Sequence, residues 1–133
     1  MSGVTAKIGI IGCGRVSGHH CRSILKARGT ELVAVCDLDF GKAKAYQDEY
    51  GARAYSNYRQ MLTENAEINT VAIVTPSGMH FEHGLDVIEN YRKNLIVEKP
   101  AFMRPSQLLK AYAAAAHHGL RIFPVFQNRH NLA

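Results

Sequence analysis

Short, continuous apolar runs alternate with helical segments along the whole chain, and this alternation constrains the fold more than any other feature. The apolar runs predict strands at residues 7–11, 32–36, 53–55, 70–74, 95–97 and 121–126. Helices are expected at residues 16–27, 41–50, 57–64, 80–91 and 106–118. Strands without alternating polar residues are typical of a parallel sheet covered by helices on both faces. With right-handed crossovers, this order predicts an α/β fold, a doubly wound parallel sheet of about six strands.

Local signals place several of the boundaries. Gly29, Gly51 and Gly119 are each positioned to end a helix. Ser56 or Asn57 can cap the helix at residues 57–64. Proline 124 lies inside the last apolar run and suits an edge strand, because proline cannot donate a backbone hydrogen bond.

Length and composition favour one folded domain. The chain has 133 residues, and no apolar run approaches the length that spans a bilayer. The N-terminal residues lack the basic start and apolar centre of a signal peptide, so a cytoplasmic location is the default expectation. Three cysteines without C-x-x-C spacing argue against a disulfide framework or a zinc site.

The formal charge of +5 invites a nucleic-acid interpretation, which the distribution of charge does not support. The basic residues are scattered, and aromatic residues do not interleave with them as stacking platforms would. We expect a solvated surface and no nucleic-acid or membrane partner. A modestly basic domain would also attract an anionic cofactor.

In open parallel sheets, ligands bind at the carboxyl ends of the strands, so the residue types that follow each strand are informative. After the first strand comes Gly12-Cys13-Gly14, close to a dinucleotide-binding fingerprint. Gly12 permits a tight turn, and Gly14 lets the backbone approach a pyrophosphate. The helix that begins near Arg15 and Val16 offers free N–H groups to the phosphates. Ser17 stands at the third glycine position, a departure that packing tolerates because serine is small.

The second predicted strand is followed by Asp37, where a carboxylate can accept hydrogen bonds from an adenosine ribose. Such a carboxylate repels a 2′-phosphate, so NAD is favoured over NADP. Two alternatives remain open. Asp37 can simply start the turn before Asp39, and Arg15 or Lys42 can host a phosphate.

The fourth predicted strand is followed by Thr75, Pro76 and Ser77, short residues that fit beside a nicotinamide ribose. Ser77 can also cap the next helix. On that helix, His80 and His83 have a spacing that suggests a metal, but no third ligand accompanies them. We therefore predict no metal site.

The apolar run at residues 95–97 stops at Glu98-Lys99-Pro100, and the last predicted strand is followed by Gln127. Buried charge is costly unless each group is paired or used. Polar side chains thus follow at least five strands at one edge of the sheet. That convergence is the best indication of a binding site.

With these motifs together, the chain resembles the glucose-fructose oxidoreductase, inositol dehydrogenase and rhizopine-catabolism (Gfo/Idh/MocA) family over essentially its whole length. The resemblance is carried by the loop from Gly12 to Ser17, Asp37, Thr75-Pro76 with His80, and above all Glu98-Lys99-Pro100. It implies a Rossmann domain that binds NAD and an enzyme that oxidises or reduces a carbinol carbon of a sugar or cyclitol. It also implies that Glu98, Lys99 and Gln127 lie near the cofactor.

The same resemblance makes Lys99 the catalytic lysine, near the reacting hydroxyl and the nicotinamide. Lysine has an ordinary pKa of about 10.4 and is a poor base at neutral pH. Partial burial and the positive nicotinamide ring would lower the pKa of Lys99, and direct pairing with Glu98 would oppose this. Lys99 is then expected to be a proton shuttle or a hydrogen-bond donor.

The ending Phe126-Gln127-Asn128-Arg129 is similar to the branch that acts on nucleotide-linked sugars, such as UDP-N-acetylglucosaminuronate 3-dehydrogenases of bacterial surface-polysaccharide synthesis. Family members carry a second, substrate-binding domain, and we expect that domain to lie outside this chain. We therefore expect a fragment that binds NAD without turning over sugar, from a homo-oligomeric full-length parent. The alternative is a non-catalytic module that senses NAD, and a DNA-binding protein is a more distant third.

Overall fold

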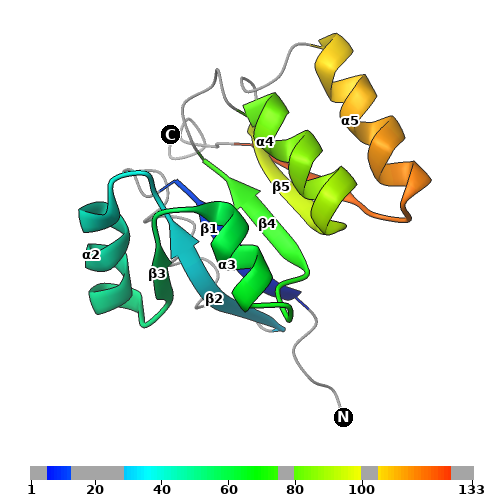
Figure 1. The fold of residues 1–133 in the computed structure, drawn as a ribbon. Helices are drawn as coiled ribbons and strands as arrows, with labels where there is room; N and C mark the ends of the chain where they lie inside the picture. The colour runs from blue at the N-terminus through cyan, green and yellow to red at the C-terminus, as the bar shows by residue number, and fades with distance from the viewer. Residues whose placement is uncertain (1–5, 13–28, 75–79, 100–104, 127–133) are drawn as a thin grey trace, which may run out of the picture.

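The protein is described by a computed structural model that covers residues 6–12, 29–74, 80–99 and 105–126 (Figure 1). Its strands are β1 (Ala6–Ile11), β2 (Thr30–Cys36), β3 (Arg53–Tyr55), β4 (Thr70–Ile73), β5 (Asn94–Lys99) and β6 (Ile122–Phe126). They form one parallel sheet in the order β3-β2-β1-β4-β5-β6. This order confirms the predicted doubly wound α/β fold, since the chain builds outward from β1 in one direction and then from β4 in the other.

The described helices are α2 (Phe40–Tyr50), α3 (Tyr58–Glu64), α4 (His80–Asp86), the π-helical turn η2 (Val87–Tyr91) and α5 (Pro105–His117). Each matches an expected helix to within about one residue at its ends, except that the single helix expected over 80–91 changes to π geometry at Val87. The helix expected at residues 16–27 lies outside the described residues.

Helices pack on both faces of the sheet. On one face, the core contains Met61 of α3, Val87 of η2 and Ala111 of α5, all buried against β1, β2, β4 and β5. In Figure 1, α3 and α4 lie across this face. The opposite face is covered by α2, where Ala43 packs among Ile10 and neighbouring strand residues. The continuous apolar strands are explained by this double coverage.

A β-bulge changes which side chains of β2 face each layer. The pairing of β1 with β2 shifts by one position between Ile8 and Gly9, which makes Val33 an extra residue in β2. Val33 and Ala34 consequently both belong to the core beneath α3, whereas Val35 belongs to the core beneath α2. The bulge therefore sets the side-chain phase of the last residues of β2.

Helix ends follow the predicted signals with one exception. Gly51 has a φ of 79° and closes α2, and Asn57 caps α3 by accepting hydrogen bonds from backbone N–H groups. Gly29 also lies in the left-handed region, with a φ of 77°. The exception is Arg92, which ends η2 with a φ of 59° although it carries a side chain.

Two asparagines connect the amino ends of neighbouring strands. Asn69 Oδ1 accepts a hydrogen bond from the Lys7 N–H (3.0 Å), next to the start of β1. Asn94 Oδ1 accepts one from the Arg121 N–H (2.8 Å), and Asn94 Nδ2 donates to the Asn69 carbonyl (3.1 Å). The first two bonds give partners to backbone N–H groups where β1 and β6 begin, and the third adds to the hydrogen bond that the Asn69 carbonyl already accepts from the Asn94 N–H (2.9 Å).

β5 is longer than predicted. It continues through Glu98 and Lys99, which pair in register with Val125 and Phe126 of β6, so the predicted end at residue 97 is wrong. Backbone pairing with β6 does not depend on the side-chain charge, and this explains the extension. β6 is an edge strand and contains Pro124, as the sequence predicted.

Candidate active site at the carboxyl edge of the sheet

The carboxyl ends of β1, β2 and β4 are joined just beyond the strands. Gly12 N–H donates to the Cys36 carbonyl (2.7 Å), and Val74 N–H donates to the Ile11 carbonyl (2.8 Å). Strand order switches between β1 and β4, the place where open parallel sheets form a ligand crevice. Gly12 is buried and has a φ of 104°, a conformation that favours glycine. The turn after β1 thus requires glycine at its first position.

Asp37 is held at this edge by its backbone and its side chain. Its N–H donates to the Tyr55 carbonyl of β3 (3.1 Å), which continues the β2–β3 ladder by one residue. Its Oδ1 accepts a hydrogen bond from the Asp39 N–H (2.8 Å). Asp37 therefore does start the turn into α2, and its half-buried carboxylate stays at the edge of the sheet. A carboxylate has about four lone-pair sites, so accepting this hydrogen bond is compatible with binding a ribose.

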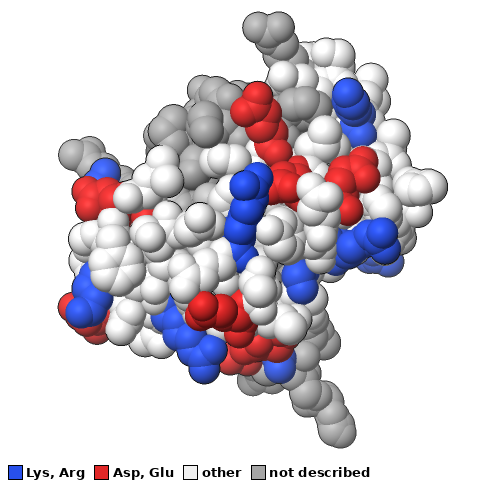
Figure 2. Space-filling view, viewed as in Figure 1, with Lys and Arg blue, Asp and Glu red and all other residues white. Residues whose placement is uncertain are grey.

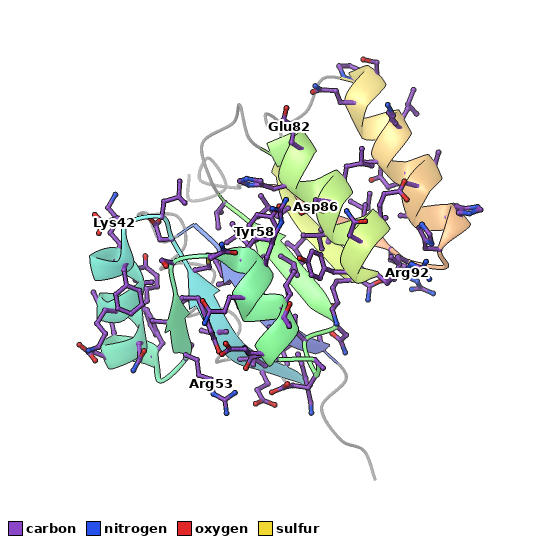
Figure 3. All side chains as sticks on the ribbon, in the orientation of Figure 1. Lys42, Arg53, Tyr58, Glu82, Asp86 and Arg92 are labelled. Atoms are coloured by element: carbon purple, nitrogen blue, oxygen red, sulfur yellow. The ribbon has the colours of Figure 1, made fainter. Side chains whose placement is uncertain are left out.

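The turn after Asp37 carries both apolar and basic side chains. Leu38 is 91% exposed and Phe40 is 48% exposed. Lys42, labelled in Figure 3, is exposed in the first turn of α2. A ligand at this end of the edge would meet a carboxylate, an apolar surface and an ammonium group within a few residues of one another.

The other half of the edge is formed by β5 and β6. Lys99 is the last residue of β5 and lies in register with Phe126, the last residue of β6. Glu98 precedes it in the same strand, and His80 begins α4. β5 is the immediate neighbour of β4, so the backbone places Lys99 one strand beyond the switch point. The remaining site residues that the sequence predicts lie outside the described ones: Gly14, Arg15, Val16, Thr75, Pro76, Ser77 and Gln127.

The thiol of Cys36, at the end of β2, is unreactive. The thiol is buried, and burial raises its pKa to about 12, with a smaller contribution from the negative charge of Asp37. The thiolate is the nucleophilic form of cysteine, so Cys36 is held in its unreactive form at neutral pH.

Sequence reasoning missed a polar cluster between α3 and α4. The Tyr58 hydroxyl donates to Asp86 Oδ2, and Arg59 Nη2 donates to the same oxygen (3.2 Å). The His83 ring lies beside the Tyr58 ring with centroids 5.1 Å apart. Figure 3 shows Tyr58 and Asp86 pointing toward one another from the two helices. No sequence motif signals this cluster, because its members meet only when the sheet brings α3 beside α4.

Within the described residues, neither the distribution of charge nor a cluster of metal-binding side chains indicates a second candidate site. In Figure 2, basic and acidic side chains are interspersed over the viewed face. Within the described ranges, no three His, Cys, Asp or Glu side chains are grouped to hold a metal ion, and His83 stands in the polar cluster described above. None of the helices in those ranges is long and apolar enough to cross a bilayer.

Comparison with known proteins identifies relatives over nearly the whole chain. Residues 6–126 match the family model GFO_IDH_MocA, described as an oxidoreductase family with an NAD-binding Rossmann fold. Inositol 2-dehydrogenase of Salmonella paratyphi B is 27% identical over 132 residues, 96% of this chain and 39% of that protein. D-glucoside 3-dehydrogenase of Escherichia coli is 30% identical over 108 residues, 80% of this chain and 30% of that protein.

A solved structure is equally close. The WlbA dehydrogenase from Bordetella pertussis, in complex with NADH and UDP-GlcNAcA, superposes with a TM-score of 0.84 at 30% sequence identity. The match covers 98% of this chain and 39% of the WlbA chain. The chain spans 30% to 39% of the length of these relatives and corresponds to a part that carries the same fold.

Proposed function

The chain belongs to the GFO_IDH_MocA oxidoreductase family and carries its NAD-binding Rossmann fold, and we propose that it is the NAD-binding domain of an enzyme that oxidises or reduces sugars. In that enzyme a hydride passes between the nicotinamide cofactor and a hydroxyl-bearing carbon of a sugar or sugar nucleotide. The observation that carries the proposal is the meeting of β1, β2 and β4 at the switch point. Gly12, Asp37 and Val74 each follow one of these strands and are joined by backbone hydrogen bonds to a neighbouring strand there.

The described residues fit a dinucleotide. Gly12 has the left-handed φ of 104° that the tight turn at the start of a glycine loop needs. Asp37 supplies an acceptor one strand away, where an adenosine ribose would be bound. We propose that Asp37 favours NAD over NADP, since a carboxylate repels a 2′-phosphate.

Lys99 is the proposed catalytic residue, at the end of β5 beside the switch point. When bound, the cofactor supplies the hydride chemistry, and the protein supplies binding, orientation and a proton. Lys99 would hydrogen-bond the substrate hydroxyl and shuttle its proton as the carbon is oxidised. Glu98, His80 and the residues of the segments 14–16, 75–77 and 127 are proposed cofactor contacts.

The substrate class is inferred from the relatives, which are named as inositol, glucoside and UDP-GlcNAcA dehydrogenases. We propose a sugar or sugar nucleotide, with UDP-N-acetylglucosaminuronate as the first candidate. Since the chain spans 30% to 39% of the length of these relatives, the substrate domain is proposed to lie outside this chain. The homo-oligomer and the cytoplasmic location stay predictions.

Calorimetric titration of the chain with NAD and with NADP tests the proposal directly. We expect saturable binding of NAD, binding of NADP weaker by about tenfold, and loss of that preference in Asp37→Ala. Lys99→Ala should leave NAD affinity unchanged, because its role is toward the substrate. Absence of binding to either dinucleotide would contradict the proposed function, and NADP binding as tightly as NAD would contradict the role of Asp37.

Turnover gives a second test. NAD is incubated with the chain and either UDP-N-acetylglucosaminuronate or myo-inositol, and NADH absorbance is followed. We expect no sugar-dependent NADH, and measurable production would overturn the proposal that substrate binding needs a further domain. In a longer parent enzyme, Lys99→Ala should abolish turnover and retain NAD binding. A module that merely senses NAD would be indifferent to this substitution.

A further inference from the structure

We propose that Asp39 is a positioning residue for cofactor selection, and that it acts by orienting the Asp37 carboxylate. This inference rests on the proposed function, because it concerns how that site binds the adenosine ribose. Asp39 lies in the turn between β2 and α2. Its contacts give it a further role.

The first step is the bond between the two residues. Asp37 Oδ1 accepts a hydrogen bond from the Asp39 N–H at 2.8 Å. The Asp37 backbone is already fixed, since its N–H donates to Tyr55 (3.1 Å) and the preceding carbonyl of Cys36 accepts from Gly12 (2.7 Å). With the backbone fixed, the hydrogen bond from the Asp39 N–H contributes directly to the side-chain orientation of Asp37.

The second step is what fixes the Asp39 N–H. Asp39 caps α2, because its Oδ1 accepts from the Gly41 N–H at 3.0 Å and its carbonyl accepts from the Lys42 N–H at 3.0 Å. Its backbone is extended, with φ −88° and ψ 100°, as an N-cap requires. The Asp39 carboxylate therefore holds its own N–H in place, and that N–H orients the Asp37 carboxylate.

The solvent exposure of the turn explains why the Asp37 carboxylate needs this hydrogen bond. The turn is open to solvent, with Leu38 91% exposed and Asp39 itself exposed, so packing alone does not restrain it. A carboxylate that binds two ribose hydroxyls must present a defined orientation before the ligand arrives. Preorganisation of this kind increases affinity by removing the cost of ordering the group on binding.

A chemical double-mutant cycle separates this role from simple stabilisation of α2. The affinities of NAD and of the analogue that lacks the adenosine ribose 2′-hydroxyl are measured by calorimetry for the unaltered chain and for Asp39→Ala. We expect removal of the hydroxyl to weaken binding by about tenfold in the unaltered chain, as for a hydrogen bond to a charged group. In Asp39→Ala the same removal should weaken binding only about twofold to threefold, because the Asp37 carboxylate is no longer oriented.

Three further variants sharpen the result. Asp39→Asn keeps the capping oxygen and should restore the tenfold effect of the hydroxyl. Asn57→Ala removes the equivalent cap of α3, where Asn57 Oδ1 accepts from Arg59 N–H (2.8 Å), and should leave the effect unchanged. In Gly41→Ala the new Cβ would lie 3.2 Å from Asp39 Oδ1, so it disturbs the cap without removing the carboxylate and should reduce the effect in part.

Equal effects of the hydroxyl in the unaltered chain and in both Asp39→Ala and Gly41→Ala would overturn the role of Asp39 and leave the proposed function standing. No binding of NAD by the unaltered chain would overturn both. If Asp39→Ala does not fold, the comparison of Gly41→Ala with Asp39→Asn decides the question.

Discussion

The Tyr58 hydroxyl donates a hydrogen bond to Asp86 Oδ2 and so joins α3 to α4 across 28 residues of sequence. Asp86 also accepts hydrogen bonds from Asn90 and from Arg59. Burial alone would raise the pKa of the Asp86 carboxyl, but these hydrogen bonds outweigh burial and hold it below its ordinary value. The cluster thus connects two helices that both pack on the same face of the sheet.

Removing the hydroxyl tests what this connection contributes to stability. Tyr58→Phe keeps the ring and its contact with His83 but leaves Asp86 without one donor. We expect a loss of about 1–2 kcal/mol in the free energy of unfolding, measured by urea denaturation. The control is Tyr112→Phe, the same change on the exposed side of α5, which should shift stability by less than about 0.5 kcal/mol. Equal effects of the two substitutions would contradict the role of the bond.

His83 should make stability dependent on pH. Burial lowers the pKa of His83, with a smaller effect of Arg59 in the same direction, while Glu82 and Asp86 oppose it. The unfolded chain therefore takes up a proton more readily than the folded one. The stabilising contribution is complete above the unfolded pKa of about 6.5 and is lost as pH falls through the lower folded pKa.

We expect the free energy of unfolding to fall between pH 7.5 and pH 5.5, and His83→Phe to reduce that fall. The substitution keeps an aromatic ring beside Tyr58 and removes a buried Nδ1 that has no hydrogen-bond partner within the described part of the chain. His117→Phe, at an exposed position of α5, is the matched control and should leave the slope unchanged. A slope unaltered by His83→Phe would refute the assignment.

Asn65 should be among the least replaceable polar residues. Its side chain is completely buried, its Oδ1 accepts from Arg53 Nη1 (2.7 Å), and its Nδ2 donates to Tyr55 Oη (2.9 Å) and the Met61 carbonyl (2.8 Å). Asn65→Ala removes all three of these side-chain hydrogen bonds and should cost about 2–3 kcal/mol in urea unfolding. Arg53→Ala removes only one of those bonds and should cost about 1 kcal/mol. The reverse order would contradict this account.

The Cys36 thiol should resist alkylation in the native protein. Burial, with Asp37 as a smaller cause, raises its pKa to about 12, so almost no thiolate exists at pH 8. We expect iodoacetamide to label the peptide that contains Cys36 slowly in buffer and rapidly in urea, as followed by mass spectrometry. Fast labelling of this peptide under native conditions would show that the end of β2 opens readily.

The strands and the doubly wound parallel fold could be predicted because continuous apolar runs and helix-terminating glycines are local signals. The bulge at Val33 could not, because it depends on how β2 pairs with β1. Nor could the extension of β5 through Lys99, since the charged side chains concealed a ladder with Phe126 that involves only the backbone. Arg92 ends η2 in the left-handed region where glycine would be the usual signal.

In the candidate site, too, some features could be predicted from the sequence and others could not. Asp37 was predicted from its place after a strand, and the structure adds the bond from Asp39 that the spacing alone does not imply. The cluster around Tyr58 and Asp86 was missed, because its residues are distant in sequence and belong to no motif. Residue types that follow strands are visible in a sequence, whereas contacts between helices depend on the packed fold.

The edge formed by β6 has a consequence for self-association. Leu95 N–H donates to the Arg121 carbonyl (3.0 Å). In a parallel ladder the backbone N–H and C=O groups of alternate residues face the same neighbour, so those of residues 121, 123 and 125 face β5. The backbone of Pro124 faces the other side, where no strand of the described residues pairs with β6. Phe123 is 43% exposed on this apolar strand, a composition prone to aggregation. Proline offers no N–H to an incoming strand, so the row of donors is interrupted where another chain would add to the sheet.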